Sequence, residues 1–391
     1  MRIESVDFFY LAMPEITDAV DGSQDALLVR VRAGNWEGWG ECEAAPLPCI
    51  AAYCCPPSHG VCKPVKTAVE GATIDSPEDI RRINAEVRRL GLDLLQTDHT
   101  LSGIDVALWD LLGRANEVPV YQLLGDRVAY PKLPYASVLL GATPEETYAK
   151  ARTICAQGFR AAKFGWGPLG KGMVQEDVAQ VRAAREGLGP EGILLLDAGV
   201  VWGDDPAPAL ARAEQFREFG LTWLEEPFRS DSLDAYRTLA DLHPELPLAA
   251  GEGANNYAMA RDLVRRGGIR YLQIDAGRIG GITTAYETRR LAEEAGITFV
   301  NHTFTSNLAL SASLQPFVGV ERFRLAEYPT EPSPLARDLT MEKIVPDADG
   351  MIRVPEAPGL GITPDLTILR QYLVPVRIEV GGHVLYETPV P

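Results

Sequence analysis

The sequence of 391 residues has few histidines and no long hydrophobic run. It contains five histidines and no H-x-H pair, which excludes a binuclear amidohydrolase barrel with its several histidine ligands. No apolar stretch approaches the roughly 20 residues that span a bilayer. The opening MRIESVDFFY lacks the charged and apolar regions of a signal peptide. We therefore expect no membrane partner and a cytoplasmic location.

Basic residues are also scarce. There are 37 Lys and Arg against 54 Asp and Glu, a formal net charge of −17. This balance argues against nucleic acid as a partner. It does not exclude an anionic substrate, because a bound cation and local lysines decide the potential of a site.

Six cysteines are present, and five of them lie between Cys42 and Cys62 without a C-x2-C pair. In the absence of an export signal we expect reduced, free thiols. A zinc site that includes His59 is the alternative. The segment of about 43–65 is rich in Pro and Cys, and its length predicts a functional loop. We expect it to close over the substrate and to carry no structural metal.

Acidic residues recur at a regular interval after short apolar runs. Asp197, Glu225 and Glu252 are 28 and 27 residues apart, Asp275 follows 23 residues later, and His302 follows 27 after that. A strand, a helix and two loops take roughly 25–35 residues. The interval therefore predicts that these side chains lie at the C-terminal ends of successive parallel strands, which meet at one mouth of a barrel.

Eight apolar runs can be counted over about 131–330. They begin near Leu133, Phe159, Gly192, Leu221, Leu246, Arg270, Ile297 and Phe323. Amphipathic patterns at 176–186 and 209–219 predict helices between them. We expect a (β/α)7β barrel, a fold of the α/β class.

The regions outside the barrel have a different pattern. Ile3–Met13, Asp25–Ala33 and Trp36–Cys42 predict short antiparallel strands, with Gly34-Asn35 as a hairpin turn. Helices are expected at 77–90 and 100–114. We expect residues 1–130 to form one domain and the segment 331–391 to pack back on it.

The acidic set predicts a metal centre. Three carboxylates at one mouth are hard oxygen ligands, which favours Mg²⁺ held by Asp197, Glu225 and Glu252. His302 and Asp275 end neighbouring strands, and an aspartate that accepts a hydrogen bond from one ring nitrogen fixes the tautomer of a catalytic histidine. GWGPLG at 165–170 matches a dinucleotide-binding pattern. Pro168 and the later glycines delay the helix that the pattern requires, so we expect a pocket-lining loop that includes Trp166.

Several motifs, in this order, resemble the enolase superfamily, mandelate racemase subgroup. They are GWGECE at 38–43, SGIDVALWDLLGRANEVPVYQLLG at 102–125, GFRAAKFG at 158–165, WLEEP at 223–227 and QIDAGRIGGIT at 273–283. The resemblance implies a modified (β/α)7β TIM barrel under an α+β capping domain built from both chain ends. It implies loops near 14–24 and 43–62 over the substrate, and a dimer or octamer. It also implies Mg²⁺-assisted removal of a proton next to a carboxylate.

The resemblance assigns Glu225 rather than Glu226 as a ligand and adds two site residues. Lys163 is expected to bind the substrate carboxylate or to polarise a hydroxyl, unless it pairs with a ligand carboxylate. Glu327 is expected to hydrogen-bond the substrate, with a plain surface acid as the alternative. One departure concerns the family's Lys-x-Lys strand end, where Gly165 replaces the second lysine and its base is missing unless Lys163 or Lys171 takes its place.

The expected function is that of a Mg²⁺-dependent lyase acting on a small-molecule carboxylate. It would dehydrate an acid sugar to a 2-keto-3-deoxy acid. A racemase or epimerase of a carboxylate is the first alternative, and a cycloisomerase is less favoured because that branch relies on the lysine that Gly165 replaces. A catalytically silent carboxylate-binding protein is the alternative outside enzymes.

Overall fold

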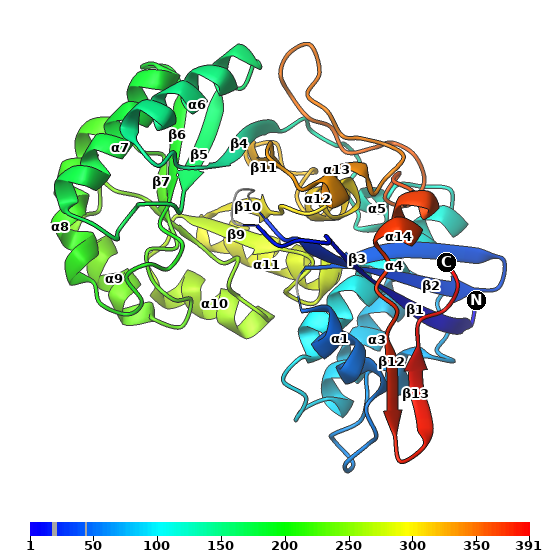
Figure 1. Cartoon of the computed structure of the whole chain (residues 1–391). Coiled ribbons are helices and arrows are strands. Elements are labelled where there is room, and N and C mark those ends of the chain that lie inside the picture. Colours follow the sequence, from blue (N-terminus) through cyan, green and yellow to red (C-terminus); the bar gives the residue numbers. More distant parts are fainter. Residues whose placement is uncertain (18–21, 44) are drawn as a thin grey trace.

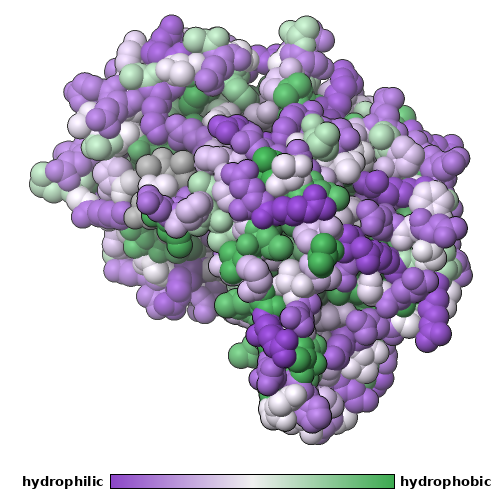
Figure 2. All heavy atoms as spheres, turned by 45° about the vertical axis from the view of Figure 1, so that its right-hand side comes forward, coloured by the Kyte–Doolittle hydropathy of each residue, from purple (hydrophilic) through white to green (hydrophobic). Residues whose placement is uncertain are grey.

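The computed structural model describes residues 1–17, 22–43 and 45–391. Two parts are visible in Figure 1: a barrel surrounded by helices, and a smaller unit of strands and helices that contains both chain ends. The outer face in Figure 2 is largely hydrophilic, with smaller groups of hydrophobic residues between. In the described part of the chain, no helix combines the length and apolar character needed to cross a membrane.

The barrel sheet contains the eight predicted strands, in the order β10-β9-β8-β7-β6-β5-β4-β11. All neighbouring pairs are parallel, and β11 returns to pair with β4. The strands are β4 (Leu133–Leu139), β5 (Ala161–Gly165), β6 (Ile193–Asp197), β7 (Trp223–Glu225), β8 (Leu248–Ala250), β9 (Tyr271–Asp275), β10 (Thr298–His302) and β11 (Leu325–Pro329).

One helix follows each of the first seven barrel strands and covers the outside of the sheet (Figure 1). This confirms the (β/α)7β barrel. The helices are α6 (Pro144–Ala156), α7 (Val174–Leu188), α8 (Ala207–Phe216) with a 3-10 turn at Arg217–Phe219, α9 (Leu233–Leu242), α10 (Tyr257–Arg266), α11 (Gly281–Ala295) and α12 (Asn307–Leu314).

Side chains fill the barrel interior as a separate apolar cluster. Tyr135, Leu195, Trp223 and Val300 are fully buried there. Tyr135 and Trp223 meet edge to face, with ring centroids 5.5 Å apart. The filled interior confines chemistry to the strand ends.

The N-terminal part begins with an antiparallel sheet in the order β1-β2-β3. The two predicted strands at 25–33 and 36–42 have the predicted ends, and the turn lies at Gly34-Asn35. The elements are β1 (Ile3–Ala12), β2 (Asp25–Ala33), β3 (Trp36–Cys42), α1 (Pro46–Cys54), α2 (Lys66–Val69), α3 (Pro77–Leu90), α4 (Thr97–Ala115) and α5 (Val120–Leu123).

Helix α4 packs directly on β3 because two glycines of the strand leave room for its backbone. A Cβ at Gly38 would lie 2.1 Å from the Ala107 carbonyl oxygen, and one at Gly40 would lie 2.1 Å from that of Gly103. Nearly all of α4 is buried between the sheet and the barrel. GWGECE is therefore a packing motif as well as part of the site described below.

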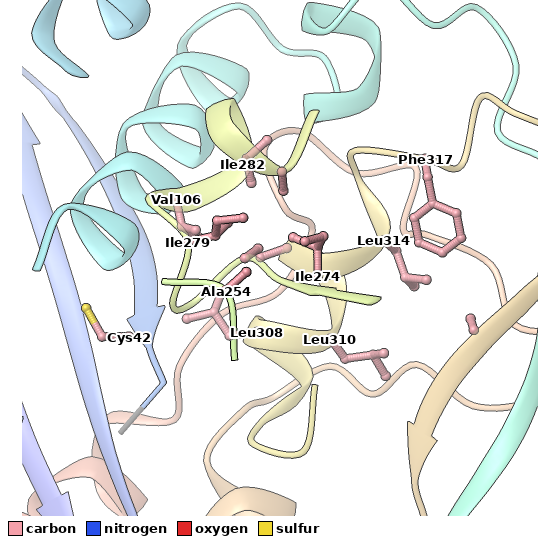
Figure 3. Close-up of a cluster of buried hydrophobic side chains, with 14 of the residues drawn as sticks. Cys42, Val106, Ala254, Ile274, Ile279, Ile282, Leu308, Leu310, Leu314 and Phe317 are labelled. Atoms are coloured by element: carbon pink, nitrogen blue, oxygen red, sulfur yellow. The ribbon is translucent and has the colours of Figure 1, made fainter. Parts of the chain in front are cut away.

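The N-terminal part and the barrel share one apolar interface. Figure 3 shows Val106 of α4 beside Ile279 and Ile282, with Leu308 of α12 in the same cluster. A buried polar link accompanies it: Asp105 of α4 accepts hydrogen bonds from the Thr283 amide (3.0 Å) and hydroxyl (2.5 Å). Such a buried, satisfied contact fixes the orientation of α4 against α11.

The C-terminal segment lies along β1. The Val374 amide donates to the Tyr10 carbonyl (2.8 Å), and the Tyr386 hydroxyl accepts a hydrogen bond from the Phe8 amide (3.1 Å). Both chain ends lie near each other (Figure 1). The elements of this segment are α13 (Pro334–Asp338), α14 (Leu366–Tyr372), β12 (Arg377–Val380) and β13 (His383–Glu387).

Two expectations about the segment after β3 need correction. The predicted loop of about 43–65 contains helix α1, in which Cys49, Ile50 and Tyr53 are buried. None of its described residues from 43 to 62 lines the central cavity, so the prediction that it closes over the substrate is wrong for those residues. Its apolar residues have the i, i+4 spacing of a helix, which the prolines at its start concealed. All six cysteines are free, as expected; metal content in this segment stays a prediction.

Candidate active site at the barrel mouth

A cavity of about 980 Å³ opens at the C-terminal ends of the barrel strands. Lys163, Asp197, Glu252, His302 and Glu327 line it, together with Trp166 and Lys171 of the loop after β5. This loop was predicted to line a pocket, and the cavity confirms it. The described part of the predicted roof at 14–24 contributes Ile16, Thr17, Gly22, Ser23 and Gln24; residues 18–21 lie outside the described residues.

Asp197 and Glu225 lie side by side because β6 and β7 pair with these two residues in register. The Glu225 side chain is fully buried, and the Trp223 indole donates to its Oε2 (2.9 Å). Burial raises the pKa of Glu225 well above its usual range, Lys163 opposes this, and the neighbouring carboxylates of Asp197 and Glu327 add to it. These carboxylates therefore require a neighbouring cation.

Lys163 provides one such cation. Its ammonium donates to Glu225 Oε1 at 2.5 Å, and it lies 2.7 Å from Glu327 Oε1 and 3.6 Å from Asp197 Oδ2. Burial alone would lower the pKa of Lys163, but Glu225 and Glu327 raise it well above its usual value. The structure thus has the alternative arrangement, in which Lys163 pairs with carboxylates that were expected to be metal ligands.

Glu327 is a buried residue of the site rather than a surface acid, with 1% of its surface exposed. Its Oε2 accepts a hydrogen bond from the Thr303 amide (2.9 Å), next to His302. Its other oxygen contacts Lys163.

His302 and Asp275 form the expected contact. The Nδ1 atom of His302 lies 2.8 Å from Asp275 Oδ2, and the Gly277 amide donates to the other oxygen of Asp275 (2.6 Å). His302 Nε2 lies 2.8 Å from Glu252 Oε2. Burial alone would lower the pKa of His302, but Glu252, Glu327 and the hydrogen bond to Asp275 raise it well above its usual value.

Gly165 lies at the end of β5, where the family pattern has a second lysine. A Cβ at this position would lie 2.7 Å from the Cβ of Asp197 and 3.0 Å from its carbonyl oxygen. The backbone of β6 thus occupies the space in which a side chain would begin. At the present spacing of β5 and β6, a lysine side chain at position 165 would collide with Asp197.

Sequence reasoning missed a set of charged residues centred on Arg278, which lines the cavity. Arg278 lies 3.7 Å from Glu252, 3.7 Å from Glu43 and 3.9 Å from Asp275. Glu43 comes from the N-terminal part and accepts a hydrogen bond from Ser23 (2.9 Å). Burial raises the pKa of Glu43 to about 7, although Arg278 opposes this shift. Arg278 lies in the motif QIDAGRIGG and Glu43 ends the motif GWGECE, but neither motif shows that the two residues meet.

Glu226, which follows the end of β7, is buried and does not line the cavity. Its Oε1 accepts hydrogen bonds from the amides of Gly251 (3.3 Å) and Gly253 (3.2 Å). These two amides flank Glu252. Glu226 therefore holds the turn that places Glu252 at the mouth.

The donor set at the mouth fits a hard divalent cation. Asp197, Glu225 and Glu252 supply oxygen atoms only, from two neighbouring strands and the following turn, in a largely buried setting. Their oxygens do not all lie within 4.8 Å of one another, because Lys163 lies between two of them and Glu252 contacts His302. Ligation of a cation and the contact with His302 would use the same Glu252 carboxylate.

A different cluster brings three ligand atoms within 4.8 Å, and among the residues described it is the one group to do so. It consists of Glu214, His243 and Glu245, none of which lines the cavity. Arg217 already pairs with Glu214 (3.4 Å) and Glu245 (3.6 Å). This cluster is not the predicted metal site.

Comparison with known proteins places both parts of the chain. Residues 146–368 match the model of the enolase C-terminal domain-like family, and residues 15–125 match that of the mandelate racemase / muconate lactonizing enzyme N-terminal domain. A crystal structure described as a predicted mandelate racemase from Rhodobacter sphaeroides is 54% identical, with a TM-score of 0.95 over 99% of each chain.

Curated relatives differ in their reactions. L-rhamnonate dehydratase of Saccharopolyspora erythraea is 30% identical over 81% of this chain and 80% of its own length. D-galactarolactone cycloisomerase of Agrobacterium fabrum is 28% identical over 70% and 74%. N-succinyl-L-Arg/Lys racemase of Bacillus cereus is 28% identical over 67% and 68%. The similarity gives a family whose members perform dehydration, cycloisomerisation and racemisation.

Proposed function

Because the chain belongs to the mandelate racemase / muconate lactonizing enzyme family of the enolase superfamily, we propose that it is a Mg²⁺-dependent acid-sugar dehydratase. It would convert an acid sugar with hydroxyls at C2 and C3 into a 2-keto-3-deoxy acid. The observation that carries this proposal is the presence of one histidine–aspartate pair at the cavity together with a closed position at Gly165.

The proposed cation ligands are Asp197, Glu225 and Glu252. Mg²⁺ held there would supply positive charge near the substrate carboxylate, where removal of the C2 proton builds negative charge. Lys163 would stay protonated between Glu225 and Glu327 and keep the paired carboxylates in place. Glu327, which lines the cavity, would accept a hydrogen bond from a substrate hydroxyl in addition to those from Lys163 and Thr303.

His302 would act as both base and acid. Its Nε2 would take the C2 proton, and the electron pair of the broken C–H bond would move onto the substrate carboxylate. That pair would then return to form the C2–C3 double bond as the C3–O bond breaks, and the proton on Nε2 would pass to the departing hydroxyl, which leaves as water. The enol product becomes the 2-keto-3-deoxy acid by moving a proton from the C2 hydroxyl to C3. Asp275 would hold the ring and stabilise its charged form.

Racemisation is the second candidate, and it needs a proton acceptor on one face of the substrate and a donor on the other. Gly165 offers no side chain on the second face. Lys163 is a poor acceptor because its ammonium is held by two buried carboxylates. These contacts favour a reaction that uses one face, in which the proton and the hydroxyl leave on the same side.

The test is turnover of an acid-sugar library with Mg²⁺ in D₂O. We expect a 2-keto-3-deoxy product with little inversion at C2. His302→Asn should lose at least the roughly 10²–10⁴-fold that general acid–base catalysis contributes. Asp275→Asn should also slow the reaction, because the tautomer would be wrong. Deuterium incorporation with inversion at C2 and without keto acid would refute dehydration and assign a second base.

A further inference from the structure

The loop between β5 and α7 holds one residue in a strained conformation at the cavity. Trp166 has φ 57°, a left-handed conformation that is costly for a bulky side chain. Its ring packs against Gly199, where a Cβ would come within 2.9 Å of the ring atoms. The surrounding structure therefore fixes Trp166 as part of the cavity wall.

A buried ion pair anchors the far end of the same loop. Arg212 donates to Asp177 at 2.5 Å, and both side chains are almost fully buried. Asp177 accepts a hydrogen bond from the Gly170 amide (3.0 Å), and Arg212 donates to the Gly172 carbonyl (3.0 Å). Lys171 is thus held between two anchored residues. The loop is a rigid support for this side chain.

The cations around the cavity differ in their partners. Three of them line it: Lys163, Arg278 and Lys171. Lys163 and Arg278 pair with buried carboxylates at the mouth. Lys171 is exposed, and among the described residues it has no carboxylate within 4.0 Å. The nearby carboxylates of Asp177 and Glu176 accept hydrogen bonds from the loop backbone at Gly170 and Met173 rather than from the Lys171 ammonium. Lys171 is thus the cavity lysine that the proposed reaction does not use.

We propose that Lys171 binds a second anionic group of the substrate, at the end remote from the reacting carboxylate. This inference rests on the proposed function and names its substrate class: dianionic acids, such as sugar diacids or phosphorylated sugar acids. The wall formed by Leu139, Leu140 and Trp166 would contact the carbon chain between the two charges. A cavity of about 980 Å³ has room for such a molecule.

Use of Lys171 as a second base is the competing role. A lysine becomes a proton acceptor where burial or a neighbouring cation removes its charge. Lys171 is exposed and its loop carries no other cation. An exposed lysine keeps its positive charge, and that charge suits it to bind an anion.

The test compares three probes of equal chain length: gluconate, glucarate and 6-phosphogluconate. Binding to the His302→Asn protein with Mg²⁺ is measured by calorimetry, so that it does not depend on turnover. We expect glucarate, 6-phosphogluconate or both to bind at least roughly tenfold more tightly than gluconate, the range of a hydrogen bond to a charged group. The stronger of the two identifies the second anion as carboxylate or phosphate.

The variants separate charge from structure. Lys171→Met, added to His302→Asn, should abolish the preference for the dianion, and Lys171→Arg should keep most of it. Lys66→Met removes a lysine of α2 outside the cavity and should leave the preference unchanged.

Equal binding of all three probes, or a preference that survives Lys171→Met, would overturn the inference even if the wild type dehydrates acid sugars. A preference that depends on Lys171, without keto acid from any library compound, would support it and remove the dehydratase proposal instead. Deuterium exchange that is lost in Lys171→Met and not in Lys66→Met would assign Lys171 as a base and also overturn it.

Discussion

Replacing Gly165 by alanine tests whether the missing lysine is a consequence of strand spacing. Gly165 and Asp197 are register partners on β5 and β6. The added Cβ would lie 2.7 Å from the Cβ of Asp197, whereas carbon atoms in contact prefer roughly 3.5–4.0 Å. Rotation of a side chain cannot relieve this contact, because the backbone fixes both Cβ atoms. The two strands must separate locally by about 1 Å.

Overpacking of this kind costs about 1–3 kcal/mol of unfolding free energy. The displaced residue is a proposed cation ligand, so we expect the Mg²⁺ affinity to fall together with the stability. Urea unfolding with and without Mg²⁺ measures the first quantity, and calorimetry measures the second. Gly60→Ala is the matched control, because a Cβ at Gly60 meets nothing within 4 Å. That variant should be within about 0.5 kcal/mol of the wild type.

Indistinguishable stability and Mg²⁺ affinity in Gly165→Ala and Gly60→Ala would refute the reasoning. It would mean that β5 and β6 adjust without cost and that a side chain at 165 is sterically possible. The absence of a base at this position would then have no steric cause. Restoring a lysine there would become a reasonable way to create a second base.

Two further predictions concern carboxylates. Glu252→Gln should weaken Mg²⁺ binding at least roughly tenfold, because it removes one of three anionic ligands; unchanged affinity by calorimetry would remove Glu252 from the site. Burial raises the pKa of Glu41 from 4.5 to about 7, and the hydrogen bond that the Ser306 hydroxyl donates to its carboxylate opposes this shift. Because the folded-state pKa is the higher one, Glu41 stabilises the fold below pH 4.5 and this contribution is lost as the pH rises towards 7. At about 1.4 kcal/mol per pH unit the loss is about 3 kcal/mol. Glu41→Gln should therefore gain stability relative to the wild type between pH 5 and pH 8, and parallel unfolding curves would contradict this assignment.

The barrel could be predicted from the sequence because its signals are local and repeated. Each strand is a short apolar run, and each ends in a polar residue at a nearly constant interval, as in Asp197 and Glu225. Helix α1 was not predicted, because Pro46 and Pro48 at its start are typical of a loop as well as of a helix N-terminus. Its burial against the N-terminal sheet, a tertiary effect, decides between the two.

The expected metal ligands and the His302–Asp275 pair were predicted from spacing. In the structure Asp197, Glu252 and His302 line one cavity, with Glu225 beside Asp197 and Asp275 in contact with His302. Their roles stay predictions. The residues behind them were not predicted, because their partners are distant in sequence. Arg278 meets Glu43 from a different part of the chain, and its pairing depends on how the N-terminal sheet is placed on the barrel. No pattern within QIDAGRIGG contains that information.

The charges at the mouth support the proposed cation and show what the N-terminal part contributes to the site. Among the described residues, six carboxylates gather there against Lys163, Arg278 and the ring of His302, which must be neutral to act as the base. The carboxylates are those of Glu43, Asp197, Glu225, Glu252, Asp275 and Glu327. Arg278 serves the side that faces the N-terminal part, and Lys163 serves the opposite side. With all six ionised and His302 neutral the excess is four negative charges, and a divalent cation would offset two of them. Because Lys163 and Arg278 already pair with carboxylates, neither is open to a second anion of the substrate. Under the proposal above that anion meets Lys171, which lines the same cavity on its anchored loop.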